Sequence, residues 1–137
     1  MKTDLQAEDY DALGAFRYAM RKFLRFSKEV VADSAKLTPE QYEALLAIKT
    51  RSDSTGITVG ELSERLQVKH HTAVSLLDKL AARKLIARQR ATEDRRQVHT
   101  KLTTLGDSVL ARLAAIHRRE LRHRTSEMIE ALRRLQK

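Results

Sequence analysis

The segment 88–103, RQRATEDRRQVHTKLT, holds the residues whose chemistry is easiest to interpret, because six Arg, Lys or His side chains surround one acidic pair. Guanidinium and ammonium groups bind phosphate oxygens, and Arg does so in bidentate fashion. Apolar and polar residues alternate on both sides of the acidic pair, which is typical of β-strands. We therefore expect a two-stranded hairpin with Arg95 and Arg96 at its tip and with Asp94 bonded to N–H groups of the turn.

The same alternation sorts the basic side chains of the hairpin by face. Arg88 and Arg90 share one face of the first strand, and His99 and Lys101 share one face of the second. Whether these two faces coincide depends on the register of the strands, which the sequence leaves open. A basic tip of this kind suits the minor groove of DNA, whose negative potential attracts an inserted arginine without a base-specific pattern.

A helix is predicted directly before the hairpin, over about residues 70–83. Ala73, Leu76, Leu77 and Leu80 follow the i, i+3, i+4, i+7 spacing of a buried helix face. The opposite face is compact and weakly charged, which suits contact with base edges in a major groove, while flanking lysines suit phosphates. An ordinary solvated face is the alternative, although such a face usually carries Glu/Lys pairs. The candidate DNA-binding residues of the helix and the hairpin are Lys69, His70, His71, Thr72, Val74, Ser75, Lys79, Arg88, Arg90, Asp94, Arg95 and Arg96.

The charge of the chain also indicates a polyanionic partner. The formal net charge is +9, and residues 69–101 and 112–137 carry +6 and +5 of it, so the remainder is slightly acidic. Such basic blocks favour nucleic acid over an anionic membrane, although solubility alone is the simpler explanation. The chain contains no cysteine, which excludes disulfides and thiol-based redox sensing. We expect a cytoplasmic protein, since no secretory leader or membrane-spanning pattern is present.

Five further helices are predicted around this region. The first is long, from about Asp9 to Ala35, and it contains five of the six aromatic residues, which favours packing against a second copy. Two shorter helices begin at capping boxes, Thr38 with Gln41 and Thr58 with Glu61. After the hairpin, Thr104 with Asp107 is expected to cap another long helix, and a separate last helix is expected from about Arg124.

From Thr38 to Gly106 the order of these elements, with the segments ELSERLQV, HTAVSLLDKLAARKLI and EDRRQVHTKLT, resembles the winged helix-turn-helix regulators of the multiple-antibiotic-resistance (MarR) family. The resemblance implies a mainly α fold with a small hairpin, a DNA-binding region at 38–103 and dimerisation helices at 1–37 and 104–137 within one unit spanning 1–137. It implies a homodimer that represses genes at pseudo-palindromic sites in double-stranded DNA. It also implies release by a small phenolic or carboxylate ligand in a cleft between the dimer helices and the winged region.

The sequence departs from the family at two positions of the recognition helix. Val74 and Ser75 stand where the family often has Ser/Thr and Arg, so the target sequence is not transferable. Aromatic candidates to line a ligand cleft are Phe16, Phe23 and Tyr42, although core packing is the more ordinary role for each.

Other classes of function have less support in the sequence. No nucleophile motif, glycine-rich phosphate loop or carboxylate pair is present, so neither an enzyme nor a cofactor is expected. His117, Glu120 and His123 have the spacing of helical metal ligands, but they lack a fourth ligand and lie among arginines, so no metal site is expected. A non-specific architectural DNA binder and a helical protein-interaction adaptor remain as alternatives.

Overall fold

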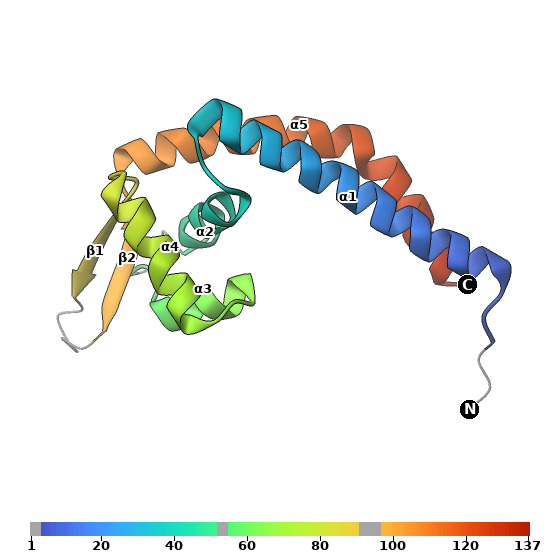
Figure 1. Cartoon of the computed structure of the whole chain (residues 1–137), viewed down its shortest axis with the longest axis horizontal. Helices are drawn as coiled ribbons and strands as arrows, with labels where there is room; N and C mark the ends of the chain where they lie inside the picture. The colour runs from blue at the N-terminus through green and yellow to red at the C-terminus, as the bar shows by residue number, and fades with distance from the viewer. Residues whose placement is uncertain (1–3, 52–54, 91–96) are drawn as a thin grey trace. The chain divides into compact units, whose positions relative to one another are not determined.

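The computed structural model describes residues 4–51, 55–90 and 97–137. The chain is mostly helical and contains one two-stranded antiparallel sheet (Figure 1). This confirms the mainly α winged-helix class expected from the sequence. The elements in chain order are α1 (Ala7–Ala35), α2 (Pro39–Lys49), α3 (Val59–Leu66), α4 (His70–Ala82), β1 (Ile86–Arg90), β2 (Val98–Leu102) and α5 (Thr104–Leu135).

The chain divides into two compact units. Unit 1 comprises residues 1–30 and 114–137, and unit 2 comprises residues 31–113. The long helices α1 and α5 each contribute residues to both units. The functional boundaries expected at 37/38 and 103/104 stay a prediction.

The core of unit 2 is made of leucine and isoleucine side chains from α2, α3, α4 and the start of the hairpin. Its fully buried members include Leu45, Ile48, Ile57, Leu62, Leu77, Leu80 and Leu85, and Val31 of α1 and Leu113 of α5 are also fully buried in this unit. Both predicted capping boxes are present: the Thr38 Oγ1 accepts from the Gln41 N–H at 3.2 Å, and the Thr58 Oγ1 accepts from the Glu61 N–H at 3.1 Å. These caps satisfy N–H groups that a helix start otherwise leaves unpaired, which fixes where α2 and α3 begin.

A tight turn joins α3 to α4. Gln67 ends α3 in the left-handed conformation, with φ 54° and ψ 48°, and its backbone N–H reaches back to the Glu64 carbonyl. Lys69 then precedes the first turn of α4 in extended conformation. The segment QVKH, residues 67–70, therefore contains the turn of a helix-turn-helix.

The hairpin is anchored to unit 2 at its base. Ile57 forms a β-bridge with Thr100, and their backbone groups exchange hydrogen bonds of 3.0 and 2.9 Å. Gly56 makes this approach possible, because its φ is +113° and an added Cβ would lie 2.7 Å from the Thr100 carbonyl oxygen. The base of the hairpin is thus fixed by backbone contacts of buried residues.

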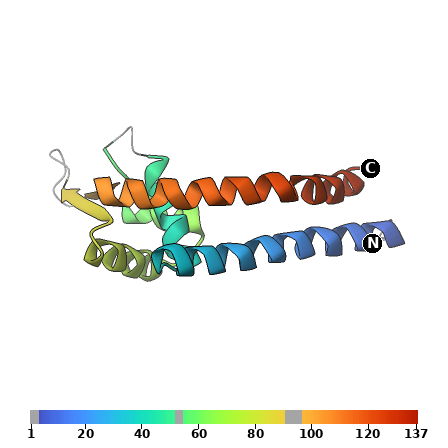
Figure 2. The ribbon, with the colours of Figure 1, turned by 90° about the horizontal axis from the view of Figure 1, so that it is seen from above.

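Unit 1 is a pair of antiparallel helices, with the beginning of α1 beside the end of α5 (Figures 1 and 2). The buried positions carry small or polar side chains rather than leucines, namely Ala12, Ala19, Ser27, His117 and Ala131. The Ser27 hydroxyl lies 2.8 Å from Nε2 of His117, whose ring meets Phe23 and Phe26 edge to face. Such small and polar side chains bury little apolar area between the two helices.

Two expectations about the last helix are wrong. A separate helix from about Arg124 does not exist, because α5 continues without a break to Leu135 and Arg124 pairs with Glu120 inside it at 2.7 Å. The capping residue is Thr103 rather than Thr104, since the Thr103 Oγ1 accepts from the Gly106 N–H at 3.0 Å. Asp107 instead binds Lys49 of α2 at 2.6 Å.

Among the described residues, no helix combines the length and the apolar character that a membrane span requires.

Candidate nucleic-acid interface

Helix α4 has one buried face and one solvent face, as its leucine spacing predicts. Ala73, Leu76, Leu77 and Leu80 are buried against the rest of unit 2. The solvent face of α4 places His71, Ser75, Asp78, Lys79 and Ala82 in exposed positions, with Thr72 and Val74 half-buried beside them. The buried stripe therefore fixes the rotation of the helix and with it the side chains that a partner can reach.

Basic side chains flank the start of α4. Lys69 and His70 are both exposed, and no side chain caps the first N–H groups of the helix. Unpaired N–H groups and the positive end of the helix dipole favour an anion at such a position, and the neighbouring lysine adds a full charge.

The strand register answers the question that the sequence left open. Arg88 lies opposite Thr100 and Arg90 opposite Val98, whereas His99 lies opposite Gln89 and Lys101 opposite Ala87. Opposed residues in an antiparallel pair share a face of the sheet. The two arginines therefore project from one face of the hairpin, and His99 and Lys101 project from the other.

The arginine face of the hairpin is the one tied to α4. Nη1 of Arg88 lies 2.7 Å from a carboxylate oxygen of Asp78 on the solvent face of α4, and both side chains remain largely exposed. The contact joins the hairpin to the helix and neutralises an acidic group that would repel phosphate. Helical spacing alone is enough to put Asp78 on the solvent face, but its pairing with Arg88 depends on the strand register, which the sequence does not give.

The other face of the hairpin turns toward the segment before α3. The Thr55 hydroxyl lies 3.4 Å from Nδ1 of His99, while Lys101 is exposed. Asp94, Arg95 and Arg96, the expected tip, lie outside the described residues.

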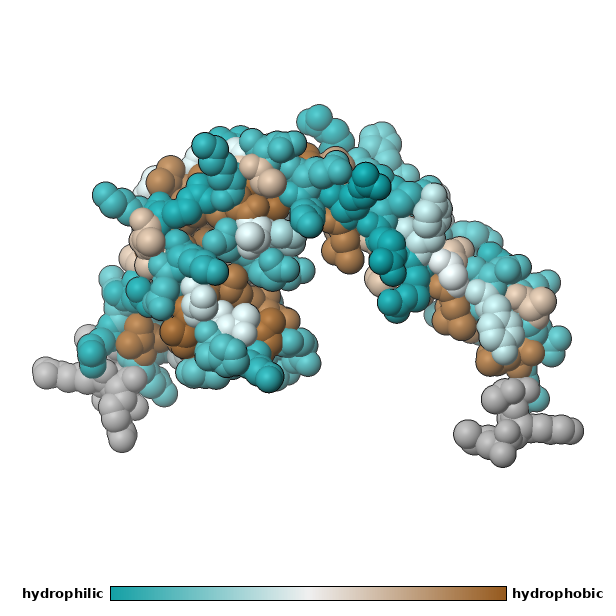
Figure 3. Space-filling view, viewed as in Figure 1, coloured by the Kyte–Doolittle hydropathy of each residue, from teal (hydrophilic) through white to brown (hydrophobic). Residues whose placement is uncertain are grey.

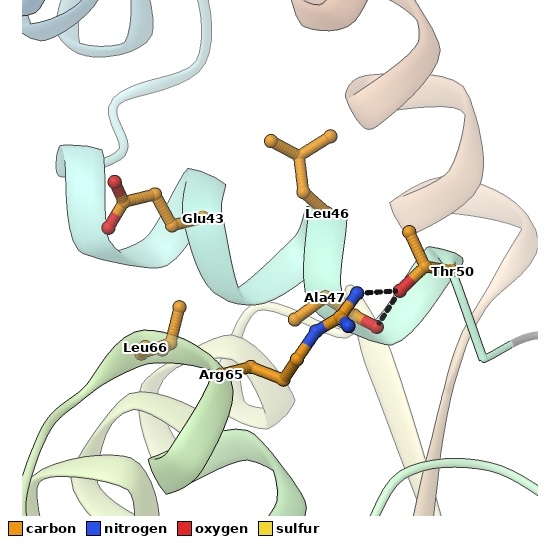
Figure 4. Close-up of a pocket in the computed structure, with 6 residues that line it drawn as sticks. All are labelled: Glu43, Leu46, Ala47, Thr50, Arg65 and Leu66. Atoms are coloured by element: carbon orange, nitrogen blue, oxygen red, sulfur yellow. Dashed lines mark hydrogen bonds between the residues drawn. The ribbon is translucent and has the colours of Figure 1, made fainter.

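A pocket of ≈ 300 Å³ opens between α2 and α3 (Figure 4). Arg65 reaches across it from α3 and donates to the Thr50 hydroxyl at 2.9 Å, and that hydroxyl donates to the Ala47 carbonyl at 2.8 Å. Burial, reinforced by the nearby Glu40, raises the pKa of the Glu43 carboxyl above its ordinary value. The lining residues are Glu43, Leu46, Ala47, Thr50, Arg65 and Leu66.

The three aromatic ligand candidates occupy different surroundings. Phe16 and Phe23 are half-buried in unit 1, and Phe23 contacts His117. Tyr42 is buried in α2 of unit 2, and burial raises its pKa. A role for these residues in ligand binding stays a prediction. The sequence missed Glu43 and Arg65, whose proximity requires α2 and α3 to be packed together.

Two of the three residues with metal-ligand spacing in α5 have other partners. His117 binds Ser27, and Glu120 binds Arg124. Within the part of the chain that the structure describes, no three His, Asp or Glu side chains form a group that could hold a metal ion.

Comparison with known proteins identifies the family. A sequence model of the MarR family matches residues 35–97, a span that includes α2, α3, α4 and β1. The HTH-type transcriptional repressor MdtR of Bacillus subtilis (strain 168) is 34% identical over 116 residues, which cover 80% of this chain and 73% of that protein. The chain belongs to the MarR family. It is therefore a MarR-family transcription regulator.

Solved structures of other proteins show the same fold as this MarR-family chain. The Staphylococcus aureus MepR–DNA complex has a TM-score of 0.72 at 23% identity and covers 82% of this chain and 80% of MepR. The transcriptional regulator BldR of Sulfolobus solfataricus has a TM-score of 0.72 at 21% identity, with 96% and 97% of the two chains covered. The winged-helix resemblance stated from the sequence is thereby confirmed.

Proposed function

We propose that this MarR-family protein is a homodimeric repressor that binds a specific sequence of double-stranded DNA. Residues 70–83 enter the major groove and the hairpin of residues 88–101 contacts the adjacent minor groove. The observation that carries the proposal is the solvent face of α4, because a buried leucine stripe holds small, weakly charged side chains outward beside basic ones. The family relationship and the DNA complex of MepR support it.

Some exposed side chains of α4 contact bases in the proposed complex, and others contact phosphates. His71, Ser75 and the methyl groups of Val74 are short enough for a helix to sit deep in a major groove, where hydroxyl and apolar groups meet base edges. Lys69 and Lys79 lie toward the two ends of this face, where phosphate oxygens pass.

The hairpin contributes a second contact through its arginines. Arg88 and Arg90 share the face of the hairpin that contacts α4 through Asp78. The two arginines and the solvent face of α4 therefore form one continuous surface in the proposal. Arg95 and Arg96 are assigned to the minor groove, with Asp94 holding the turn.

Dimerisation is supported by the apolar surface that unit 1 leaves uncovered. A helix pair that buries mainly alanines has a small core, and among the described residues no large apolar side chain of unit 1 is buried. A second copy would bury them and would bring two α4 helices to half-sites about 34–36 Å apart, as in other dimeric helix-turn-helix proteins. The exposed apolar residues of unit 1 are Leu5, Tyr10, Leu13, Tyr18, Leu24, Leu121, Ile129 and Leu132.

Release by a small organic ligand completes the proposal. The resemblance implies a ligand cleft, for which Phe16, Phe23 and Tyr42 are the aromatic candidates from the sequence, and the pocket between α2 and α3 is a second candidate site. Its volume lies at the lower end of the range of small-molecule sites, and Arg65 supplies a guanidinium for a carboxylate. A ligand that wedges α2 from α3 would shift the turn at Gln67 and hence α4.

Selection from a random duplex library tests the function as a whole. We expect the purified full chain to enrich an inverted repeat whose half-sites are about 10 base pairs apart, centre to centre. Binding without enrichment would favour the architectural binder, and absence of duplex binding would favour the adaptor.

Two variants then assign the DNA-facing residues of α4. Lys69→Ala should weaken all duplexes alike and reduce the slope of log K against log[salt] by about 0.9 for each phosphate that the variant no longer neutralises. Val74→Ser should change the preferred bases while leaving that slope unchanged. Equal behaviour of the two variants would contradict the placement of α4 in the groove.

A further inference from the structure

Unit 1 carries a second basic surface, on the side of α5 that faces away from its buried positions. Arg118, Arg119 and Arg122 are all exposed, and at about 100° per residue they fall within an arc of about 100° opposite His117 and Ala131. We call these three residues the α5 arginine stripe. Hydrophilic side chains cover most of the face of this unit that Figure 3 shows.

The charge of the stripe is uncompensated. None of the three arginines has a hydrogen-bond or ion-pair partner among residues 4–51, 55–90 and 97–137. The nearby carboxylates are engaged elsewhere, Glu120 with Arg124 at 2.7 Å and Glu127 with Lys22 at 3.4 Å. Like charges at i, i+4 destabilise a helix, and a face that served only solubility would mix both signs. The arrangement therefore indicates a ligand that supplies the missing negative charge.

The chemistry of the stripe fits the backbone of duplex DNA better than other polyanions. Four residues of helix rise about 6 Å, which is comparable to two phosphate steps of about 3.4 Å along each strand. Ala115 and Ser126 flank the arginines on the same arc, so no bulky side chain hinders a broad phosphate surface. Residues 115–126 place no aromatic ring on the arc for stacking on single-stranded bases and no large apolar group for a membrane surface. The first large apolar side chain on the arc is Ile129, about two turns beyond Arg122, and it belongs to the surface assigned to the dimer.

We propose that the α5 arginine stripe binds the phosphate backbone of a duplex segment other than the one that α4 and the hairpin contact. The inference rests on the proposed function, because it assumes one duplex at α4. The two surfaces belong to different units, since the stripe lies in unit 1 and α4 and the hairpin lie in unit 2. A dimer would carry two stripes and could hold two stretches of DNA together.

A two-duplex capture experiment tests this inference on the full chain. An immobilised 30-base-pair duplex is saturated with protein, and a fluorescent duplex of unrelated sequence is then added over a range of salt concentrations. We expect the natural protein to retain the second duplex at low salt and to lose it steeply as salt rises. Replacing Arg118, Arg119 and Arg122 by Gln should lower this retention at least about tenfold and change binding of the first duplex by less than about threefold.

A charge-matched variant distinguishes binding by the α5 arginine stripe from attraction by the net positive charge of the whole protein. Arg21, Arg25 and Lys28 are exposed on α1 of the same unit, and replacing them by Gln removes the same charge. We expect this variant to retain the second duplex, and a variant with Lys at the three stripe positions to retain most of it.

Four results would overturn the inference. If both Gln variants lost the second duplex equally, its retention would depend only on the net charge of the protein. If the stripe variant retained the second duplex unchanged, the stripe would have no part in binding it. Protein that stays on the first duplex but captures only polyglutamate would make the partner an acidic protein. Failure of the first duplex to bind would overturn the inference together with the proposed function, whereas the other results leave that function intact.

Discussion

Units 1 and 2 cover their apolar side chains to different extents. Unit 2 buries leucines from three helices and the hairpin, and Leu45 and Leu80 are 0% exposed. Unit 1 buries mainly alanines, and it leaves Tyr10 62% and Leu132 45% exposed. Unit 2 is therefore stabilised by its own contacts, whereas unit 1 leaves an apolar surface exposed, which the proposed dimer would cover. The difference matches the proposed division of roles, in which unit 2 presents the surface for DNA and unit 1 assembles the dimer.

The largest loss of unfolding free energy is expected from a substitution in the core of unit 2. Leu80→Ala removes a fully buried side chain from the stripe behind α4, and such truncations cost about 2–5 kcal/mol of unfolding free energy. Urea denaturation at constant protein concentration measures the loss. Leu132→Ala, the matched truncation in unit 1, should cost far less at a concentration where the protein is monomeric. Equal losses in the monomer would show that the two units do not differ in this way.

A charge introduced on the apolar surface of unit 1 should weaken dimerisation rather than the folding of the chain. Leu132→Glu would place a carboxylate in the interface of the proposed dimer, so we expect the dissociation constant of the dimer to rise at least about tenfold, or about 1.4 kcal/mol. Sedimentation equilibrium measures this constant, and circular dichroism checks that the helices persist. The control is Leu105→Glu, because Leu105 is an exposed leucine of unit 2. An unchanged dimer in the Leu132 variant would contradict the assignment of this surface.

The sequence predicted unit 2 better than unit 1 for a physical reason. Local signals define unit 2: the capping boxes at Thr38 and Thr58 and the leucine spacing of α4 each depend on residues a few positions apart. In unit 1 the pairing partners are distant in sequence, as for Ser27 and His117, so periodicity could not reveal which positions meet.

The wrong prediction of the α5 cap and the missed contacts of the candidate interface have the same cause, because both depend on residues that are distant in sequence. Thr104 looked like a cap because Asp107 follows at the right spacing, but Asp107 binds Lys49, 58 residues away. The exposed face of α4 was predictable from the helical repeat alone. The pairing of Arg88 with Asp78 was not, because it requires the strand register and the distance between two elements.

The ion pair between Arg88 of the hairpin and Asp78 of α4 should contribute less free energy than the Leu80 and Leu132 substitutions remove. A double-mutant cycle with Arg88→Ala and Asp78→Ala should give a coupling energy of about 0.2–1 kcal/mol, because both partners are largely exposed. Urea denaturation of the four proteins provides the energies, and the coupling should shrink at high salt. The pair Arg25 and Glu29 on α1 offers a matched cycle in unit 1, where the coupling of an i, i+4 helix pair is expected to be about 0.3–0.5 kcal/mol. A coupling of zero for Arg88 and Asp78 would mean that the base of the hairpin alone positions it.

The smallest effect concerns Glu43, at the edge of the packed part of unit 2. Burial raises the pKa of this carboxyl, and the nearby Glu40 raises it further, so the folded protein holds the proton more tightly than the unfolded chain does. The contribution to stability is therefore fully present below the unfolded-state pKa and is lost as pH rises through the higher folded-state pKa. Glu43→Gln mimics the protonated form, so the melting temperatures of the variant and the natural protein should agree at low pH and diverge in favour of the variant toward neutral pH. Glu40→Gln should reproduce part of this divergence, since it removes the weaker of the two causes. A difference between Glu43→Gln and the natural protein that stays constant with pH would show that the carboxyl is as well solvated in unit 2 as in the unfolded chain.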